Sequence, residues 1–297
     1  MSLVDLRTLS RRAVPVVDTG KVQGLDFVPG SRLMVVVGPD GFLALFDTRS
    51  ERIVRRLRGH TGDVHPPGVS PALLATADGS ETVRLWSLPD GRPKGRPLRF
   101  PRWVETVRLS PDGRLLAAVT VDDDIEHSTV EVVDPRTRRR VARLRVADHV
   151  GTAAFSPDGR LLAVGTRTGA TQVWSTADWK PLGRPLVGDS GGILGVAISP
   201  DGRTLATGGD TGAVQVWDIP TRQAVGARLP GVLSRSAFPA FTRDGAYLIA
   251  SYDTGDAYRW DVRARSLVRH ACRLAGRRLT RAEWAEFLPG RSYDPAC

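Results

Sequence analysis

Hydrophobic and polar residues alternate in short runs along most of the chain, and turn-forming residues separate the runs. In one such run, Leu194, Val196 and Ile198 alternate with other residues, which is the two-residue period of a β-strand. Ser-Pro-Asp-Gly follows at 199–202, where proline fixes φ and glycine permits the positive φ of a tight turn. Three more strands are expected after this turn, at 204–208, 213–218 and 224–229.

The same pattern recurs at a fixed spacing. Four segments with a strand, an Asp-Gly turn and a second apolar strand align directly, and they begin at Val104, Val150, Leu194 and Ser236. Their turn glycines are 46, 43 and 43 residues apart, namely Gly113, Gly159, Gly202 and Gly245. A second in-phase series has steps of 40 to 47 residues and consists of Phe46, Trp86, Val133, Trp174, Trp217 and Trp260. Both series match the period of a four-stranded unit, about 40–45 residues.

Six such repeats cover about residues 22–274 and predict an all-β fold of four-stranded antiparallel units. Before them, 2–9 resembles the end of a third strand and 13–17 resembles a fourth, so 1–21 is expected to form a partial unit. Two arrangements fit this count: seven positions with one of them incomplete, or a closed set of six. A third possibility is that the reading frame is the end of a longer protein.

The residues after the repeats, 275–297, predict a capping tail with a short helix. Thr280 and Glu283 have the spacing of a capping box, and Pro-Gly at 289–290 would end the helix. Repeat proteins need an end that covers apolar surface. The residues expected to face the repeats are Ala282, Trp284, Ala285 and Leu288.

Composition narrows the class of protein. Hydrophobic residues make up 41% and charged residues 25%, which is typical of a globular protein with a real core. No run of eighteen apolar residues predicts a membrane span, and the first seven residues lack the pattern of a secretion signal. We therefore expect a cytoplasmic protein, with export as the alternative if the chain is part of a longer membrane-anchored protein.

The net charge of +10 raises the question of nucleic-acid or anionic-membrane partners. All but three of the 42 basic residues are arginines, and they are scattered apart from short runs such as 138–140. A basic, solvated surface is therefore favoured over nucleic-acid binding.

Catalytic and metal-binding motifs are absent from the sequence. It has no G-x-S-x-G, H-E-x-x-H or P-loop. Gly-Asp-Ser-Gly-Gly at 188–192 resembles a protease serine motif, but it lies in phase with the repeat, in the connection that leads into the fifth unit. His127 and His149 are far from each other and from any cysteine in the sequence, which argues against zinc. We expect no catalytic residue, no metal and no cofactor.

Two segments stand out as candidates for partner contact. Arg102 and Trp103 lie in the connection into the third repeat and are of the types enriched at binding hot spots, although packing between units is an equal alternative for Trp103. The other segment is an acidic insertion, 122–127, which lacks the glycine and the spacing of a calcium loop. A solvated acidic loop is the favoured interpretation of it.

The repeats resemble the WD40 family. Leu57 to Gly62 resembles that family's Gly-His element, and the third strands that end at Trp86, Asp218 and Asp261 resemble its Trp-Asp strand. The resemblance covers nearly the whole chain and implies a β-propeller, whose four-stranded blades surround a central channel.

In typical repeats of this family a histidine, a serine or threonine, an aspartate and the tryptophan form a hydrogen-bonded network. Only His60 with Trp86 offers the first and last of these, and Ser80 stands where that repeat's aspartate is expected. Asp189 replaces the histidine in the fifth repeat. We therefore expect blades held mainly by apolar packing, each buried Trp or Val contributing about 1.5–3 kcal/mol. The residues assigned structural roles are His60, Trp86, Trp174, Trp217 and Trp260.

The resemblance also implies a function. WD40 propellers hold protein partners on the surface that carries the second-to-third-strand loops, so we expect a protein-interaction scaffold or docking module, monomeric and without nucleic acid. The tail resembles the ending of WD40 regions in high-GC bacterial signalling proteins. The partner-facing candidates are Arg102, Trp103, Asp122, Asp123, Asp124, His127 and Asp189.

An enzyme or small-ligand sensor that uses the central channel is the alternative function. It would need several polar residues that point inward from the first strands, where Asp26, Glu105 and Arg108 are the few charged exceptions. Cys272 and Cys297 are the only cysteines and bracket the tail. We hypothesise that they lie close together and form a disulfide, whereas a reducing cytosol would keep them as free thiols.

Overall fold

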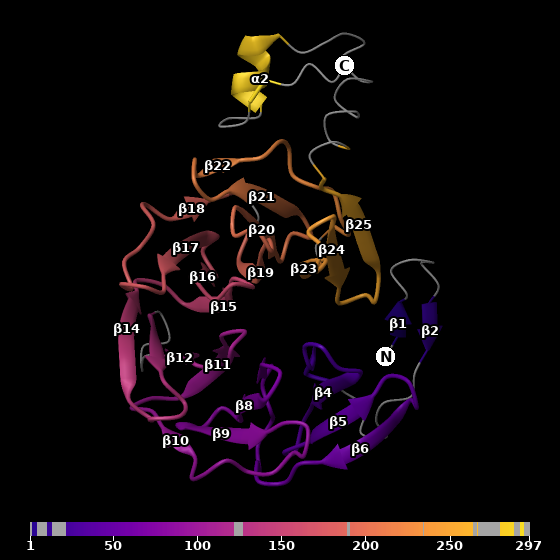
Figure 1. Ribbon diagram of the computed structural model, residues 1–297, viewed down its shortest axis with the longest axis vertical. Coiled ribbons are helices and arrows are strands. Elements are labelled where there is room, and N and C mark those ends of the chain that lie inside the picture. Colours follow the sequence, from indigo (N-terminus) through magenta and orange to yellow (C-terminus); the bar gives the residue numbers. More distant parts are fainter. Residues whose placement is uncertain are drawn as a thin grey trace. The chain divides into compact units, whose positions relative to one another are not determined.

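The computed structural model describes residues 2–4, 11–13, 22–121, 127–188, 191–233, 235–263, 266, 280–287 and 292–293. Its strands form short antiparallel sheets that are the blades of a six-bladed β-propeller (Figure 1). Two compact units, residues 1–155 and 156–297, make up the structure. The boundary between them falls inside the fourth blade, after its first strand.

The first unit holds three complete blades, and in each the sheet order follows the chain order. Blade 1 consists of β3 (Gly24–Phe27), β4 (Leu33–Val37), β5 (Leu43–Asp47) and β6 (Arg52–Arg56). Blade 2 consists of β7 (Gly68–Val69), β8 (Leu73–Ala77), β9 (Thr82–Ser87) and β10 (Leu98–Arg99). Blade 3 consists of β11 (Val104–Leu109), β12 (Leu116–Val121), β13 (Ser128–Val133) and β14 (Arg140–Val146). The first strand of blade 4 is β15 (Val150–Phe155).

The second unit continues the same pattern. The later strands of blade 4 are β16 (Leu161–Thr166), β17 (Ala170–Ser175) and β18 (Leu186–Val187). Blade 5 consists of β19 (Ile193–Ile198), β20 (Thr204–Gly209), β21 (Val214–Asp218) and β22 (Gln223–Ala224). The described strands of blade 6 are β23 (Ala237–Phe241), β24 (Tyr247–Tyr252) and β25 (Ala257–Asp261). Any fourth strand of this blade would lie mostly outside the described residues.

Each member of the series from Phe46 to Trp260 lies in the third strand of its blade, as predicted. The prediction for the fourth strand of the fifth repeat was too long. There, β22 ends at Ala224, and Leu229 forms only an isolated bridge with Val214. Gly226 has a φ of +67° and so breaks the extended backbone between them.

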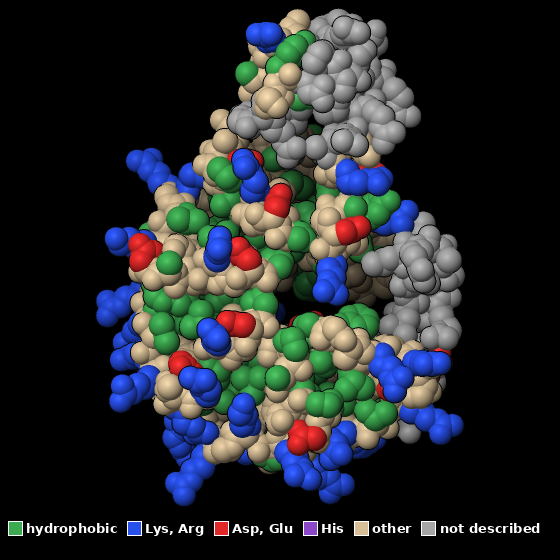
Figure 2. All heavy atoms as spheres, in the orientation of Figure 1, with side chains coloured by type: hydrophobic (Ala, Val, Ile, Leu, Met, Phe, Trp, Pro, Cys, Tyr) green, Lys and Arg blue, Asp and Glu red, His purple; other side chains and the backbone are tan. Residues whose placement is uncertain are grey.

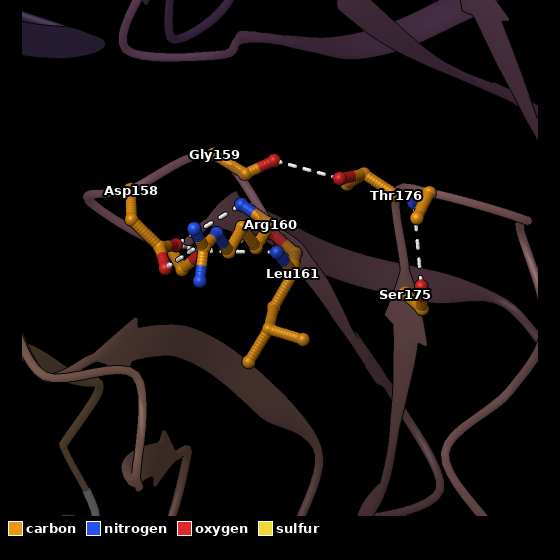
Figure 3. Close-up of polar contacts among 8 residues, drawn as sticks. Asp158, Gly159, Arg160, Leu161, Ser175 and Thr176 are labelled. Carbon is orange, nitrogen blue, oxygen red and sulfur yellow. Dashed lines mark hydrogen bonds and ion pairs between the residues drawn. The ribbon is translucent and has the colours of Figure 1, made fainter.

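The Ser-Pro-Asp-Gly turns owe their shape to side-chain hydrogen bonds, which Figure 3 shows for blade 4. Ser156 Oγ donates to Asp158 Oδ1 at 2.5 Å and accepts from the backbone N–H of Leu161 at 2.9 Å. Gly159 has a φ of +74°, and its carbonyl accepts a bond from Thr176 Oγ1 at 2.8 Å, which ties this turn to the one between β17 and β18. The same serine or threonine and aspartate pattern closes the turns at 110–115, 199–204 and 242–247.

Apolar side chains fill the space between neighbouring blades. Trp86 of blade 2 is 2% exposed and belongs to one cluster with Leu43 and Leu45 of blade 1. Val104 and Val107 of blade 3 are fully buried in a second cluster, with β8 and β9 residues of blade 2. The first unit therefore has its core between blades.

The two ends of the chain agree in part with the predictions. Strands β1 (Ser2–Val4) and β2 (Arg11–Ala13) pair antiparallel in a sheet of their own. Helix α2 (Arg281–Phe287) begins with the predicted capping box, because Thr280 Oγ1 accepts from Glu283 N–H and Glu283 Oε2 accepts from Thr280 N–H at 2.8 Å.

The predicted inward face of α2 was wrong for two of its residues. Trp284 is buried and meets the Tyr293 ring edge-on, with centroids 5.7 Å apart, but Ala282 and Ala285 are exposed. Among the described side chains of this seven-residue helix, only that of Trp284 is buried. Leu288, Cys272 and Cys297 lie outside the described residues, so the disulfide hypothesis stays a prediction.

Candidate functional site

A hydrogen-bonded network in blade 2 links the strands β8 and β9 with the connection that precedes β7, through a buried hydroxyl. Thr76 Oγ1 on β8 accepts from Trp86 Nε1 at 2.8 Å and lies 2.7 Å from His60 Nε2. The other ring nitrogen of His60, Nδ1, is 3.0 Å from Asp78 Oδ2. If His60 is neutral and protonated at Nδ1, Thr76 donates to Nε2 and the Nδ1–H faces the Asp78 carboxylate.

Electrostatics favour that protonation state. Burial lowers the pKa of His60 below 6.5, and the bond to Asp78 offsets this only in part. Burial acts to raise the pKa of Asp78, but hydrogen bonds from Ser80 and His60 outweigh it and hold that pKa at about 2. The pair is therefore a neutral imidazole that donates to a carboxylate.

The carboxylate of this network corrects the sequence prediction. Ser80 was expected in place of the aspartate, yet Asp78 is present and Ser80 Oγ donates to it at 2.7 Å. Asp78 lies eight residues before its tryptophan, whereas Asp40 lies six residues before Phe46, so counting from the third strand missed it. Blade 2 therefore has the complete network that the resemblance implies.

The other predicted structural tryptophans keep less of it. Trp217 Nε1 donates to Thr207 Oγ1 at 3.1 Å, which preserves half of the network in blade 5. Trp174 is 7% exposed, and Trp260 is half-buried and stacks on Tyr258 with centroids 6.0 Å apart. Apolar and aromatic packing thus replaces the network in these two blades.

The network fixes a turn that lines a cavity. The turn between β8 and β9 carries Asp78 at its start, and Ser80 Oγ also accepts from the backbone N–H of Thr82 at 3.2 Å. The carbonyls of Ser80 and Glu81 accept bonds from Val104 N–H at 3.0 Å and Phe100 N–H at 2.8 Å. These bonds hold the connection from blade 2 to blade 3 against the turn. The cavity between them has a volume of about 620 Å³ and is lined by Gly79, Ser80, Glu81, Pro101, Arg102, Trp103 and Arg143.

Trp103 is both packed and accessible. Its indole Nε1 lies so close to Gly79 that a Cβ there would be 2.9 Å away, and its ring meets His65 edge-on with centroids 6.4 Å apart. The side chain is nevertheless 40% exposed. The two interpretations left open by the sequence therefore each describe part of this residue, with one face packed and the other open to a ligand.

Behind Trp103 lies a set of polar contacts centred on Glu105. His65 Nδ1 donates to the Glu105 carbonyl at 2.5 Å, and His149 Nε2 lies 2.9 Å from Glu105 Oε2. His65 lies before β7, Glu105 lies in β11 and His149 directly precedes β15, so the bonded residues are 40 or 44 positions apart. Residues about one repeat apart are therefore neighbours here, a relation that the sequence prediction did not use.

The remaining charged residues of the first strands are also engaged. Arg108 donates to the carbonyl of Ala153 at 2.9 Å and to Thr106 Oγ1 at 3.0 Å. Desolvation by the surrounding protein raises the pKa of Asp26 to about 6, and the positive charge of Arg108 offsets part of that rise. Arg108 thus links neighbouring first strands rather than presenting a free guanidinium.

Comparison with known proteins finds a family model that matches two segments of the chain. The family model described as "WD domain, G-beta repeat" matches residues 141–175 and 179–218. These two segments match the WD40 repeat. These matched segments lie in blades 3 to 5, and the complete network of blade 2 has the chemistry of the same repeat.

Two known proteins are similar to this chain. Eukaryotic translation initiation factor 3 subunit I of Aspergillus terreus is 32% identical over 111 residues, which are 36% of this chain and 33% of that protein. The chain thus spans about a third of that relative's length. Hydrazine synthase of Kuenenia stuttgartiensis superposes with a TM-score of 0.76 at 17% identity, covering 88% of this chain and 89% of that chain. At such low identity this likeness shows the fold alone.

The structure brings only some of the predicted partner-facing residues together. Arg102 and Trp103 line the same cavity. His127 is exposed directly before β13. Asp122 to Asp124 and Asp189 lie outside the described residues. Within the described part of the chain, no helix has the length and apolar character that a membrane span requires.

Proposed function

We propose that this WD40 chain is a protein-interaction scaffold or docking module, and that a partner binds at the cavity around Trp103. The observation that carries this proposal is a partly exposed tryptophan held against a rigid turn, with Arg102 and Arg143 beside it. Tryptophan and arginine in a partly enclosed site are the residue types that dominate binding energy at protein interfaces.

The rigidity of the site supports binding as well. The buried network of His60 and Thr76 holds the turn from Asp78 to Glu81. The turn therefore loses little conformational entropy when a partner binds. A volume of about 620 Å³ suits one or two side chains of a partner rather than a whole domain. We expect a projecting loop or an extended segment to enter.

The wider setting belongs to the same proposal. Residues 1–21 would be a partial blade, 22–274 the propeller and 275–297 a capping tail, in a monomeric cytoplasmic protein that serves bacterial signalling. Asp122 to Asp124, His127 and Asp189 would lie on the partner-facing side with Trp103, because second-to-third-strand loops and connections between blades share one end of the strands.

The test compares two tryptophan variants of the full chain. Trp103→Ala should weaken partner capture from a lysate by about thirtyfold, the effect of losing a hot-spot residue worth about 2 kcal/mol. Trp179→Ala is the control, because Trp179 lies in the turn between β17 and β18, at the other end of the strands. Quantitative mass spectrometry would identify the proteins whose capture falls in the Trp103→Ala variant but not in the Trp179→Ala variant. A capture profile that both variants leave unchanged would refute the proposed site.

A further inference from the structure

A second cavity lies at the opposite end of the strands from Trp103, between blades 2 and 3. It has a volume of about 450 Å³. Three exposed cations stand on its lining, Lys94, Arg114 and Arg136. The two carboxylates of the lining, Asp112 and Asp134, each accept a backbone N–H bond within their own turns, at 3.0 Å and 2.7 Å. The cavity therefore presents three exposed cations beside two carboxylates that are already in use, and one of these carboxylates, Asp112, forms an ion pair with Arg114 at 3.6 Å.

The connection that carries Lys94 is tied to the one that carries Arg136. Arg138 Nη2 donates to the carbonyl of Arg96 at 2.6 Å, and a Cβ added at Gly95 would meet this guanidinium at 2.5 Å. The contact joins the third-to-fourth-strand turns of blades 2 and 3 into one surface. Side-chain contacts between the two blades therefore hold the walls of the cavity in place.

Two of the three cations, Lys94 and Arg136, have no basic counterpart in blades 4 and 5. In blades 4 and 5 Arg222 makes the same contact, since it donates to the carbonyls of Leu182 and Arg184. The repeat alignment places Leu182 where Lys94 stands and Pro220 where Arg136 stands. The turn geometry is therefore shared, but the paired cations are an addition that the fold does not need.

The basic surface continues along the outermost strand of blade 3. Strand β14 is seven residues long, whereas the fourth strands of blades 2, 4 and 5 have two residues each. It is the last strand of its sheet, so one side of its backbone has no strand partner among the described strands. Figure 2 shows Lys and Arg side chains gathered along the outer edge where β10 and β14 lie. Lys94, Arg139 and Arg145 form no ion pair with any carboxylate in the described part of the chain.

We propose that this cavity and the adjoining edge of β14 bind an acidic, extended polypeptide segment of a partner protein. Its carboxylates would reach Lys94, Arg114 and Arg136, and its backbone would add to the free edge of β14 as a further strand. Positive side chains on an edge strand also discourage uncontrolled pairing, and an acidic strand is the type that they would still admit.

Polypeptide is favoured over nucleic acid by two features of this surface. No aromatic residue occurs in 89–99 or 134–146 to stack on bases. A free strand edge offers N–H and C=O groups that match another peptide backbone.

The test uses the full chain and a fluorescein-labelled peptide of four Glu-Val repeats, in which the glutamates share one face of a strand. Fluorescence anisotropy measures its affinity for the wild type and for two double variants. Lys94→Glu with Arg136→Glu should weaken binding about tenfold, because two attractions become repulsions. Lys180→Glu with Arg203→Glu is the matched control, which reverses two exposed charges in turns of blades 4 and 5 and should change the affinity less than about twofold.

Further probes test the strand addition and the class of ligand separately. A peptide of four Glu-Pro repeats carries the same charge but lacks half of the backbone N–H groups, so it should bind several-fold more weakly than the Glu-Val peptide. Equal binding of the two would overturn the strand addition. An eight-nucleotide oligothymidylate, or vesicles of anionic lipid, that bound more tightly and lost binding in the Lys94 variant would overturn the peptide assignment. Trp103→Ala should leave the peptide affinity unchanged, so this site and the proposed partner site fail separately.

Discussion

Replacing Thr76 by valine tests whether the blade 2 network holds the turn that lines the Trp103 cavity. Thr76 is fully buried, and its hydroxyl accepts from Trp86 Nε1 and donates to His60 Nε2. Valine has nearly the same shape but removes the hydroxyl, so both of these ring nitrogens lose their buried partner. Each buried polar group left without a partner costs about 1–3 kcal/mol, and the added methyl returns about 1 kcal/mol. The free energy of unfolding should therefore fall by about 3 kcal/mol.

Two control variants make the comparison specific. Thr207→Val in blade 5 removes the 3.1 Å bond from Trp217 Nε1 and a long bond of 3.5 Å to the Gln215 carbonyl, so its expected cost is about 1 kcal/mol. Thr76→Ser keeps the hydroxyl and should retain most of the stability. Urea unfolding followed by circular dichroism measures all three, and hydrogen exchange at residues 78–82 reports on the turn itself. A Thr76→Val variant that is as stable as the wild type, or that loses no more stability than Thr207→Val, would refute this role of the network.

Two more predictions concern the same turn. Gly79→Ala places a Cβ 2.9 Å from Trp103 Nε1 at a φ of +70°, so we expect about 1 kcal/mol of destabilisation and a shifted Trp103 fluorescence emission, and an unchanged spectrum would contradict the contact. Stability should also fall in acid: below pH 6.5 the unfolded chain protonates His60 while the folded chain, with its lower pKa, does not. A second loss, from Asp78, should follow between pH 3.8 and about 2. Urea midpoints across this range measure both losses, and His60→Gln should remove the first one, so an unaltered profile in that variant would count against the network.

The features predicted well from the sequence are local or strictly periodic. The third strands and the positive-φ glycines follow from residues that recur at a fixed spacing, and the capping box of α2 depends on two residues three positions apart. Local side-chain chemistry decides such features, so they need no knowledge of distant contacts. The face that α2 buries was mispredicted because it depends on Tyr293, which lies beyond the helix.

The site was harder to predict because its residues meet across blades. Asp78 was missed because turn lengths differ between repeats, which moves the aspartate relative to the tryptophan. The contacts of Glu105 with His65 and His149 join residues 40 and 44 positions apart. Comparing residues one repeat apart would have suggested these neighbours. The exposure of Trp103 depends on the absence of a side chain at Gly79 and could not be inferred from its own position.

The most direct test of partner binding at the Trp103 cavity is site-specific photo-crosslinking in cells. Benzoylphenylalanine at position 102 lies on the cavity lining, and the same group at position 179 lies in a turn at the other end of the strands. We predict discrete protein adducts from position 102 that are absent from position 179 and are lost when Trp103→Ala is added. Adducts that persist unchanged in the Trp103→Ala background, or a position 102 that yields no protein adduct, would contradict the proposed function.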